Sequence, residues 1–300
     1  MPIRDFGLLF LICFVWGVNL VMTRWVVSDF DVPPLFFAAI RFLGVAVLLI
    51  PFLRPVPKNL GTLFLIAMLI GCLNFGLLFV GLANADVSAA AVTGQLGVPM
   101  STIMSMVFLG EKIGWRRALG ISLAFAGVVV IAFDPGSFSL SFGLLLIFFA
   151  AVLGSAGGIV MKRMPQMNPL NLSAWVGLFS FAPLFGMSAL LETGQAETYI
   201  AGGWQVWAAS LFAIIGVSIF SHSAFYTLLK RHEVSVLSPL TLMTPLWGIF
   251  FGVTLLNEPF TSKLVIGGAV SLAGVFLIAI RRNTVLPEAS LGKKIGAGDS

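Results

Sequence analysis

Ten apolar stretches alternate with short polar segments along the chain. With a window of about 19 residues, they cover residues 6–27, 35–53, 63–82, 88–109, 118–133, 142–161, 170–191, 204–229, 236–256 and 264–280. Most are long enough to cross a hydrocarbon core of roughly 30 Å as a helix. They lack the alternating polar period and the short length of membrane β-barrel strands. The pattern therefore predicts an all-α membrane protein with ten transmembrane helices.

The composition agrees with a membrane location. Hydrophobic residues make up 59% of the chain and charged residues only 10%, whereas an ordinary soluble domain is roughly a quarter charged. The first apolar stretch follows Arg4, but it is too long for a secretory signal and has no small-residue cleavage site, so we expect a retained helix. Residues 283–300 are rich in Gly, Lys and Ser, and we expect a disordered tail there.

The distribution of charge predicts the orientation. If the N-terminus is cytoplasmic, most of the Lys and Arg residues lie on the cytoplasmic side, as membrane proteins prefer. These residues are Arg4, Arg54, Lys58, Lys112, Arg116, Arg117, Lys162, Arg163, Lys230, Arg231, Arg281, Arg282, Lys293 and Lys294. We therefore expect both termini to be cytoplasmic, in the cytoplasmic (inner) membrane. The net charge of +5 follows from this topology and does not indicate a nucleic-acid partner.

The chain contains an internal duplication. Residues 87–132 recur as residues 234–279 at an offset of 147 positions, the separation of Glu111 and Glu258. The offset also places Gly120 on Gly267. Ten helices divide into five per copy, and an odd number forces the second copy to enter the membrane inverted. We expect one repeat over residues 1–134, an inverted repeat over 135–282 and a cytoplasmic tail over 283–300.

Three motifs resemble a known transporter family. Each half carries a Pro-bearing helix, a Leu-x-Glu hinge at residues 109–111 or 256–258, and a Gly-rich final helix. The first helix contains Phe-Val-Trp-Gly-x-Asn over residues 14–19. Together these are similar to the EamA family of the drug/metabolite transporter superfamily. The resemblance implies an exporter of amino acids or related metabolites, with helices 1, 3, 4, 6, 8 and 9 around a central cavity and helices 5 and 10 as packing elements.

The hinge residues have a structural interpretation. Glu111 and Glu258 lie one or two residues before a predicted helix, so each carboxylate is expected to cap the helix that follows it. A proton-carrying role is the alternative, but both residues lie at a water interface rather than at depth. Pro99 and Pro245 are expected to bend their helices. The glycines spaced seven apart in the final helix of each half share a helix face, which predicts packing seams.

Polar residues at membrane depth are candidates for the substrate path. Asn19, Arg41, Asn74 and Gln95 come from the first four helices, each about seven or eight residues from the outer end, or roughly 10–12 Å deep. Amides donate and accept hydrogen bonds, and Arg binds carboxylates. We therefore predict that these four residues form one polar layer around a shared cavity.

Each member of this layer has a structural alternative. Asn19 and Asn74 are equally suited to form hydrogen bonds between helices. For Gln95 we favour a role in the cavity, because the bend at Pro99 leaves backbone carbonyl groups nearby without hydrogen bonds. The long side chain of Arg41 would reach outward to the acidic residues at 29–31 if it extended to the interface.

The second half supplies a different set of candidates. His222, Tyr226 and Thr244 form part of a hydroxyl-rich layer nearer the inside, and Trp16 adds an aromatic wall. His222 would act as a proton relay or, alternatively, as a neutral histidine held by hydrogen bonds.

These features predict a secondary transporter that exports neutral or aromatic amino acids and related small metabolites by alternating access, with the lipid bilayer as its surroundings. No Gly-x-x-x-x-Gly-Lys loop is present, so ATP hydrolysis on this chain is excluded. A multidrug exporter of cationic compounds is the alternative, but it would need a carboxylate at depth. An intramembrane enzyme is a third alternative, with little beyond His222 to support it. We expect no metal and no cofactor. The sequence is compatible with a monomer.

Overall fold

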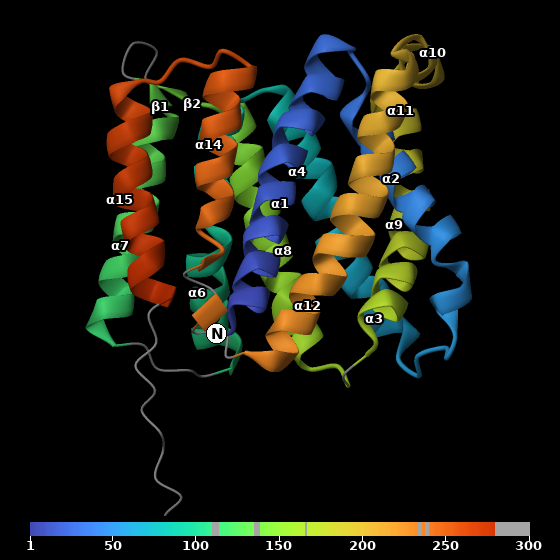
Figure 1. Cartoon of the computed structure of the whole chain (residues 1–300), viewed down its shortest axis with the longest axis horizontal. Coiled ribbons are helices and arrows are strands. Elements are labelled where there is room, and N and C mark those ends of the chain that lie inside the picture. Colours follow the sequence, from blue (N-terminus) through green and yellow to red (C-terminus); the bar gives the residue numbers. More distant parts are fainter. Residues whose placement is uncertain (110–113, 135–138, 166, 233–235, 238–239, 280–300) are drawn as a thin grey trace, which may run out of the picture.

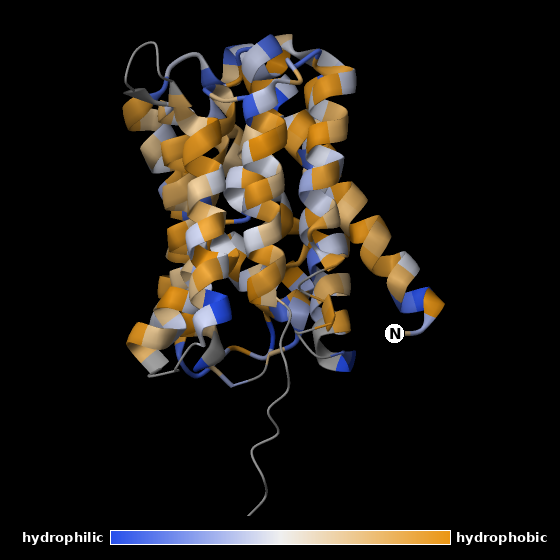
Figure 2. Cartoon of the chain, turned by 90° about the vertical axis from the view of Figure 1, so that its left-hand side faces the viewer, coloured by the Kyte–Doolittle hydropathy of each residue, from blue (hydrophilic) through white to orange (hydrophobic). Residues whose placement is uncertain are grey.

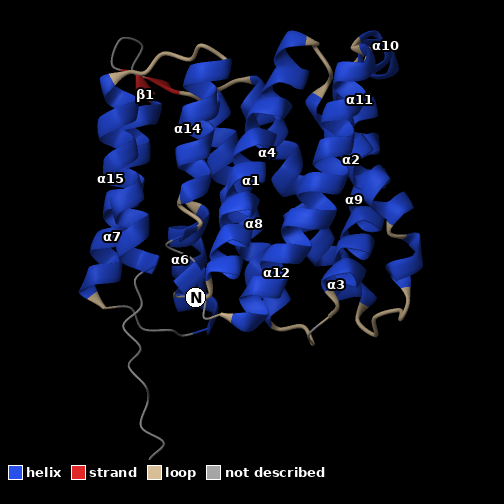
Figure 3. Ribbon diagram, viewed as in Figure 1, coloured by secondary structure: helices blue, strands red, loops and turns tan. Residues whose placement is uncertain are grey.

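The computed structural model describes the chain except for residues 110–113, 135–138, 166, 233–235, 238–239 and 280–300. Within the described part, nearly all secondary structure is helical, and the helices stand side by side in one bundle (Figure 1). A single short antiparallel pair joins strand β1 (Phe133–Asp134) to strand β2 (Ser139–Leu140) at one end of the bundle (Figure 3). The predicted all-α class is thus confirmed for the described residues.

The first half of the chain forms seven α-helices in the described part. They are α1 (Ile3–Asp29), α2 (Pro34–Leu48), α3 (Leu60–Ile66), α4 (Asn74–Ala83), α5 (Val87–Gly94), α6 (Gly97–Leu109) and α7 (Trp115–Ala132). The π-helical segment η2 (Ala67–Leu73) joins α3 to α4, and the 3-10 turn η1 (Ile50–Leu53) follows α2.

The second half is likewise helical in its described part. Its described helices are α8 (Phe142–Lys162), α9 (Pro169–Leu191), α10 (Gln195–Ala201), α11 (Gly203–Leu211), α12 (His222–Arg231), α14 (Met243–Leu255) and α15 (Ser262–Ala279). A second π-helical segment, η3 (Phe212–Ser221), joins α11 to α12. The 147-residue offset carries residues 67–73 onto 214–220, so the two π-helical segments occupy corresponding places in the two halves.

Eight helical segments of the described chain are long and apolar enough to cross a membrane, judged by length and composition. Two further apolar helices, α2 and α14, are shorter and coincide with the second and ninth predicted spans. α2 ends at Leu48, and Pro51, which has no N–H group to donate to a helix carbonyl, lies in the 3-10 turn that follows. Figure 2 shows hydrophobic residues along the helices and hydrophilic residues gathered towards the two ends of the bundle. Such a surface suits contact with lipid.

Helices α7 and α15 pack against each other through glycines. A Cβ atom on Gly120 would lie 2.7 Å from the carbonyl oxygen of Gly274, and one on Gly127 would clash with the carbonyl oxygen of Gly267. The predicted glycine seams are therefore confirmed. The 147-residue offset carries Gly120 onto Gly267 and Gly127 onto Gly274. The two contacts therefore correspond to each other, with the partners exchanged. Such reciprocity is typical of elements related by a two-fold axis.

Candidate functional site

Arg41 lies in the middle of α2 and is only 1% exposed. Its Nε donates a hydrogen bond of 2.9 Å to Ser218 Oγ, and Ser218 in turn donates to the carbonyl oxygen of Ala213 over 3.0 Å. The guanidinium carbon lies 4.4 Å from the ring centroid of Phe75, with Phe42 6.0 Å away. The alternative in which Arg41 reaches outward to residues 29–31 is wrong, because the hydroxyl and the aromatic faces hold the cation inside the bundle.

The charge of Arg41 has no protein counter-ion in the described part of the chain. No carboxylate there lies within ion-pair distance of it, and its buried Nη1 has no hydrogen-bond partner. A buried cation left without a partner costs several kcal/mol. In a membrane protein such a residue is retained mainly where it serves the passage of a solute.

Arg41 lines a cavity of about 80 Å³ between the two halves. The first half contributes residues of α2, α3, η2 and α4, and the second half contributes residues of α8, α9, η3 and α12. The polar side chains of the lining are Arg41, Ser173, Ser218, His222 and Tyr226. Aliphatic and aromatic side chains form the rest of the wall. The site is therefore an apolar pocket with one fixed positive charge.

Three of the predicted site residues meet in this cavity, namely Arg41, His222 and Tyr226. Trp16 stands behind them, because its ring centroid lies 5.7 Å from that of His222 and 5.2 Å from that of Phe225. Its Nε1 is buried without a hydrogen-bond partner. Trp16 thus belongs to the aromatic surroundings of the pocket.

The other predicted residues do not line this cavity. Asn74 donates a hydrogen bond of 2.5 Å from Nδ2 to the carbonyl oxygen of Ala150 on α8, which is the structural alternative for that residue. Asn19 is buried in α1, and Gln95 lies in the break between α5 and α6. Thr244 lies near the start of α14. The cavity predicted to be shared by Asn19, Asn74 and Gln95 stays a prediction.

Phe75 and Ser173 belong to the lining but were not among the predicted site residues. Phe75 had one available signal, since the 147-residue offset places it on His222. Phe75 and His222 both line the cavity, one from each half. Ser173 offered no comparable signal, because a single serine in an apolar helix is ordinary.

Glu258 lies at the end of the bundle where α14 finishes and α15 begins. Its Oε1 accepts a hydrogen bond of 2.5 Å from the backbone N–H of Val87, and its Oε2 accepts from the backbone N–H of Ser88 over 2.9 Å and from the Ser88 hydroxyl over 2.5 Å. The carboxylate therefore caps α5 in the first half, and the prediction that it caps α15 is wrong. Thr261 is the cap of α15, since its Oγ1 accepts from Leu264 N over 3.2 Å.

Local backbone geometry explains the redirection of Glu258. Asn257, directly before Glu258, has a positive φ of 53°, in the left-handed region. Gly252 leaves the space that the carboxylate occupies, because a Cβ there would clash with Glu258 Oε2. Glu111, the corresponding hinge residue of the first half, lies outside the described residues.

Two further contacts tie elements together at the same end. Glu192 follows α9 and caps α2, accepting from the backbone N–H groups of Leu35 over 2.7 Å and Phe36 over 3.0 Å. Arg24 donates from Nη1 to the carbonyl oxygens of Leu82 over 2.8 Å and Ala83 over 2.5 Å at the C-terminus of α4. Both pairings satisfy backbone groups that helix ends leave open.

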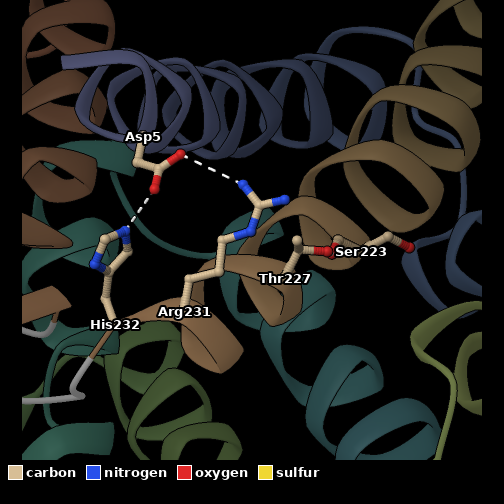
Figure 4. Close-up of polar contacts among 5 residues, drawn as sticks. All are labelled: Asp5, Ser223, Thr227, Arg231 and His232. Carbon is tan, nitrogen blue, oxygen red and sulfur yellow. Dashed lines mark hydrogen bonds and ion pairs between the residues drawn. The ribbon is translucent and has the colours of Figure 1, made fainter. Parts of the chain in front are cut away.

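At the other end, Asp5 connects the start of α1 to the end of α12 (Figure 4). Its Oδ2 lies 2.6 Å from His232 Nε2, and its Oδ1 lies 3.6 Å from Arg231 Nη1. Thr227 donates to the carbonyl oxygen of Ser223 over 2.8 Å on the same helix. This polar contact joins the two halves at the end where the chain begins.

A bundle of membrane-length apolar helices around a buried, charged pocket defines a multi-pass membrane protein that handles a small solute. The profile of the EamA-like transporter family matches residues 6–133 and again residues 141–280, and the chain belongs to this family. It is therefore a member of the drug/metabolite transporter superfamily.

Curated relatives match most of this chain. The chain is 28% identical to a probable amino-acid metabolite efflux pump of Escherichia coli (strain K12), over 92% of this chain and 95% of the relative. It is 26% identical to a chloroplastic WAT1-related protein of Arabidopsis thaliana, over 88% of this chain and 67% of the relative. A solved crystal structure has the same fold, with a TM-score of 0.63 and 19% identity over 92% of this chain and 96% of the other.

Proposed function

We propose that this protein is a secondary transporter that exports neutral or aromatic amino acids and related small metabolites across the cytoplasmic membrane. The observation that carries the proposal is the pocket around Arg41, which both halves of the chain build. The name of the Escherichia coli relative, an amino-acid metabolite efflux pump, supports the substrate class. The positive charge of the pocket disfavours the alternative of a cationic drug exporter, since a bound cation would meet Arg41 and, among the described lining residues, no carboxylate.

Alternating access is the proposed mechanism, with two inverted five-helix repeats over residues 1–134 and 135–282 moving against each other. The reciprocal contacts between α7 and α15 support this arrangement, as do the corresponding π-helical segments. The short helices α2 and α14 would complete ten spans. Irregular helices near a pocket between two repeats are typical of secondary transporters.

The contacts at the two ends suggest the conformational state. The pocket includes Met161 near the end of α8 and Leu172 near the start of α9, so it lies towards the end of the bundle where α8 gives way to α9. The chain also begins at that end (Figure 1). Glu258, Glu192 and Arg24 tie helices together at the opposite end. With the N-terminus cytoplasmic, this arrangement corresponds to a state closed to the outside.

The remaining candidate residues take supporting roles in this proposal. Pro99 is the third residue of α6 and Pro245 the third residue of α14, so both lie where a broken helix resumes, and we assign them to hinges. We assign Asn19, Gln95 and Thr244 to the part of the path beyond the pocket. Asn74 holds α4 against α8 in this state.

Flux through sealed proteoliposomes tests the function. Vesicles containing the purified protein are loaded with neutral and aromatic amino acids and with their deaminated analogues, and efflux is compared with that from protein-free vesicles. The variant Ser173→Phe should fill the pocket and reduce flux by about tenfold or more. Ala182→Phe, an equally large change at an exposed position of the same helix, should leave flux unchanged. If no solute leaves the vesicles faster than from the protein-free control, the transport proposal fails.

A further inference from the structure

We infer that the pocket binds its solute through a carboxylate held by Arg41, and that it prefers compact apolar monocarboxylates without an ammonium group to the corresponding zwitterionic amino acids. This inference rests on the proposed function, because it treats the pocket as the transport site. It names the chemical class within the broader group of amino acids and related metabolites.

The guanidinium is held as a ready-made anion site. Its Nε is fixed by Ser218 Oγ at 2.9 Å, and its plane is supported by Phe75 at 4.4 Å. Ser218 has its own acceptor in the carbonyl oxygen of Ala213, so its position does not depend on the solute. The buried Nη1 is left without a partner. A carboxylate is the group that best matches the donors of a guanidinium.

The balance of charge favours a monoanion. Arg41 supplies one positive charge, and the described residues that line the pocket include no Asp or Glu. A monocarboxylate would make the occupied pocket neutral. The carboxylate of a zwitterion would also neutralise Arg41. Its ammonium group, however, would lose its hydration and find only hydroxyl and imidazole groups as hydrogen-bond partners. Burying an ammonium without a carboxylate partner is costly.

The walls determine the rest of the solute. Val45, Ile66, Ile70 and Val176 present aliphatic surface beside the polar cluster. Burial of apolar surface is favourable by about 25 cal/mol per Å². A short branched hydrocarbon tail attached to the carboxylate satisfies both parts of the pocket.

A matched ligand series tests this inference on the unmodified protein. The series consists of leucine, 4-methylpentanoate, 3-methylbutylamine and 4-methylpentanamide. All four share one branched tail and differ in the polar group attached to it. Binding is measured calorimetrically in detergent, which avoids passive crossing of a bilayer by the weak acid. We expect 4-methylpentanoate to bind at least about tenfold more tightly than leucine. The amine and the amide should bind at least about a hundredfold more weakly than 4-methylpentanoate.

Variants at the anchor supply a second readout. In Arg41→Gln, the preference for 4-methylpentanoate over 4-methylpentanamide should fall by about tenfold or more. Arg116→Gln removes an exposed cation from α7 and should leave the preference unchanged. Should Arg41→Gln fail to fold, the ligand series on the unmodified protein still decides the matter.

The outcomes separate the two proposals. If leucine binds as tightly as 4-methylpentanoate, or if the amine competes with it, the inferred substrate class is overturned while transport of amino acids stands. If 4-methylpentanoate binds as expected but no solute of the series crosses a proteoliposome membrane, the anion site stands and the transport proposal fails.

Discussion

At the scale of single residues, the environment of Arg41 decides how the site is interpreted. A basic residue in the middle of a membrane helix is compatible with reaching outward or with turning inward. The inward position follows from contacts with residues distant in sequence, above all Ser218 and Phe75. Asn74 shows the opposite outcome, since its amide bonds the backbone of α8 instead of facing the pocket.

The hydrogen bond between Ser218 and Arg41 yields a prediction about binding. Ser218→Ala should leave Nε of Arg41 without its partner, so the guanidinium should lose its fixed orientation and carboxylate affinity should fall about tenfold, or about 1.4 kcal/mol. Binding of 4-methylpentanoate measured by calorimetry checks this. Ser221→Ala is the matched control, because that hydroxyl bonds the carbonyl oxygen of Gly216 on its own helix. Equal losses in both variants would contradict a positioning role for Ser218.

At the scale of elements, helix ends in one half are satisfied by residues from the other half. Glu258 and Glu192 follow α14 and α9, yet they cap α5 and α2. A carboxylate at a helix N-terminus is favourable because of the helix dipole and the unpaired N–H groups. These caps therefore connect elements that are remote in sequence.

Removing the charge of one cap should lower stability. Glu258→Gln replaces one of the two acceptor oxygens by an amide nitrogen that cannot accept from an N–H group of α5, so the free energy of unfolding should fall by about 0.5–2 kcal/mol. Thermal melting in detergent measures this, and Glu197→Gln at an exposed position serves as the control. Flux should persist in the folded fraction. Complete loss of flux from well-folded Glu258→Gln would instead show that the carboxylate takes part in transport.

The seam between α7 and α15 should tolerate no side chain. In Gly127→Ala, the new methyl group would meet the backbone of Gly267 and Ser271, which cannot move without separating the helices. We expect a loss of about 1–3 kcal/mol from overpacking, seen as a lower melting temperature. Gly158→Ala makes the same change in α8 where no atom lies within 4 Å of the added group. Similar melting temperatures for the two variants would argue against a close seam.

At the scale of the whole molecule, the two ends of the bundle differ in their contacts. Glu258, Glu192 and Arg24 satisfy helix ends at one side. At the other side, Asp5 joins α1 to α12, and the pocket lies nearer to this end. The orientation of the bundle in the membrane therefore decides to which side the pocket would open.

Cysteine labelling can establish this orientation. Both native cysteines, Cys13 and Cys72, are buried, and replacing them by Ala provides a background without thiols. In that background, Glu197→Cys should react with an impermeant maleimide added outside intact cells, because the excess of Lys and Arg at the opposite end of the bundle predicts that α10 lies outside. Lys58→Cys, exposed at the opposite end, should react only after permeabilisation. The reverse pattern would overturn the proposed topology.

Much of the architecture was accessible from sequence because it depends on periodic, local properties. Apolar stretches of membrane length predicted helices, and eight of them have the length and composition of spans in the described chain. The spacing of Gly120 and Gly127 predicted a packing face, since residues seven apart share one side of a helix. The repeated motifs predicted the EamA family, which matches both halves.

Partners across the bundle were decided only by the tertiary structure. The sequence identified Arg41, His222 and Tyr226 as polar groups at depth, but their meeting in one pocket depends on how α2, η3 and α12 pack. The same holds for Glu258, whose proximity in sequence to α15 suggested the wrong helix. Hydrophobic length and periodicity are properties of a segment, so the sequence determined the class, the helices and the duplication. A hydrogen bond or a counter-charge is a property of two segments, and folding alone brings those together.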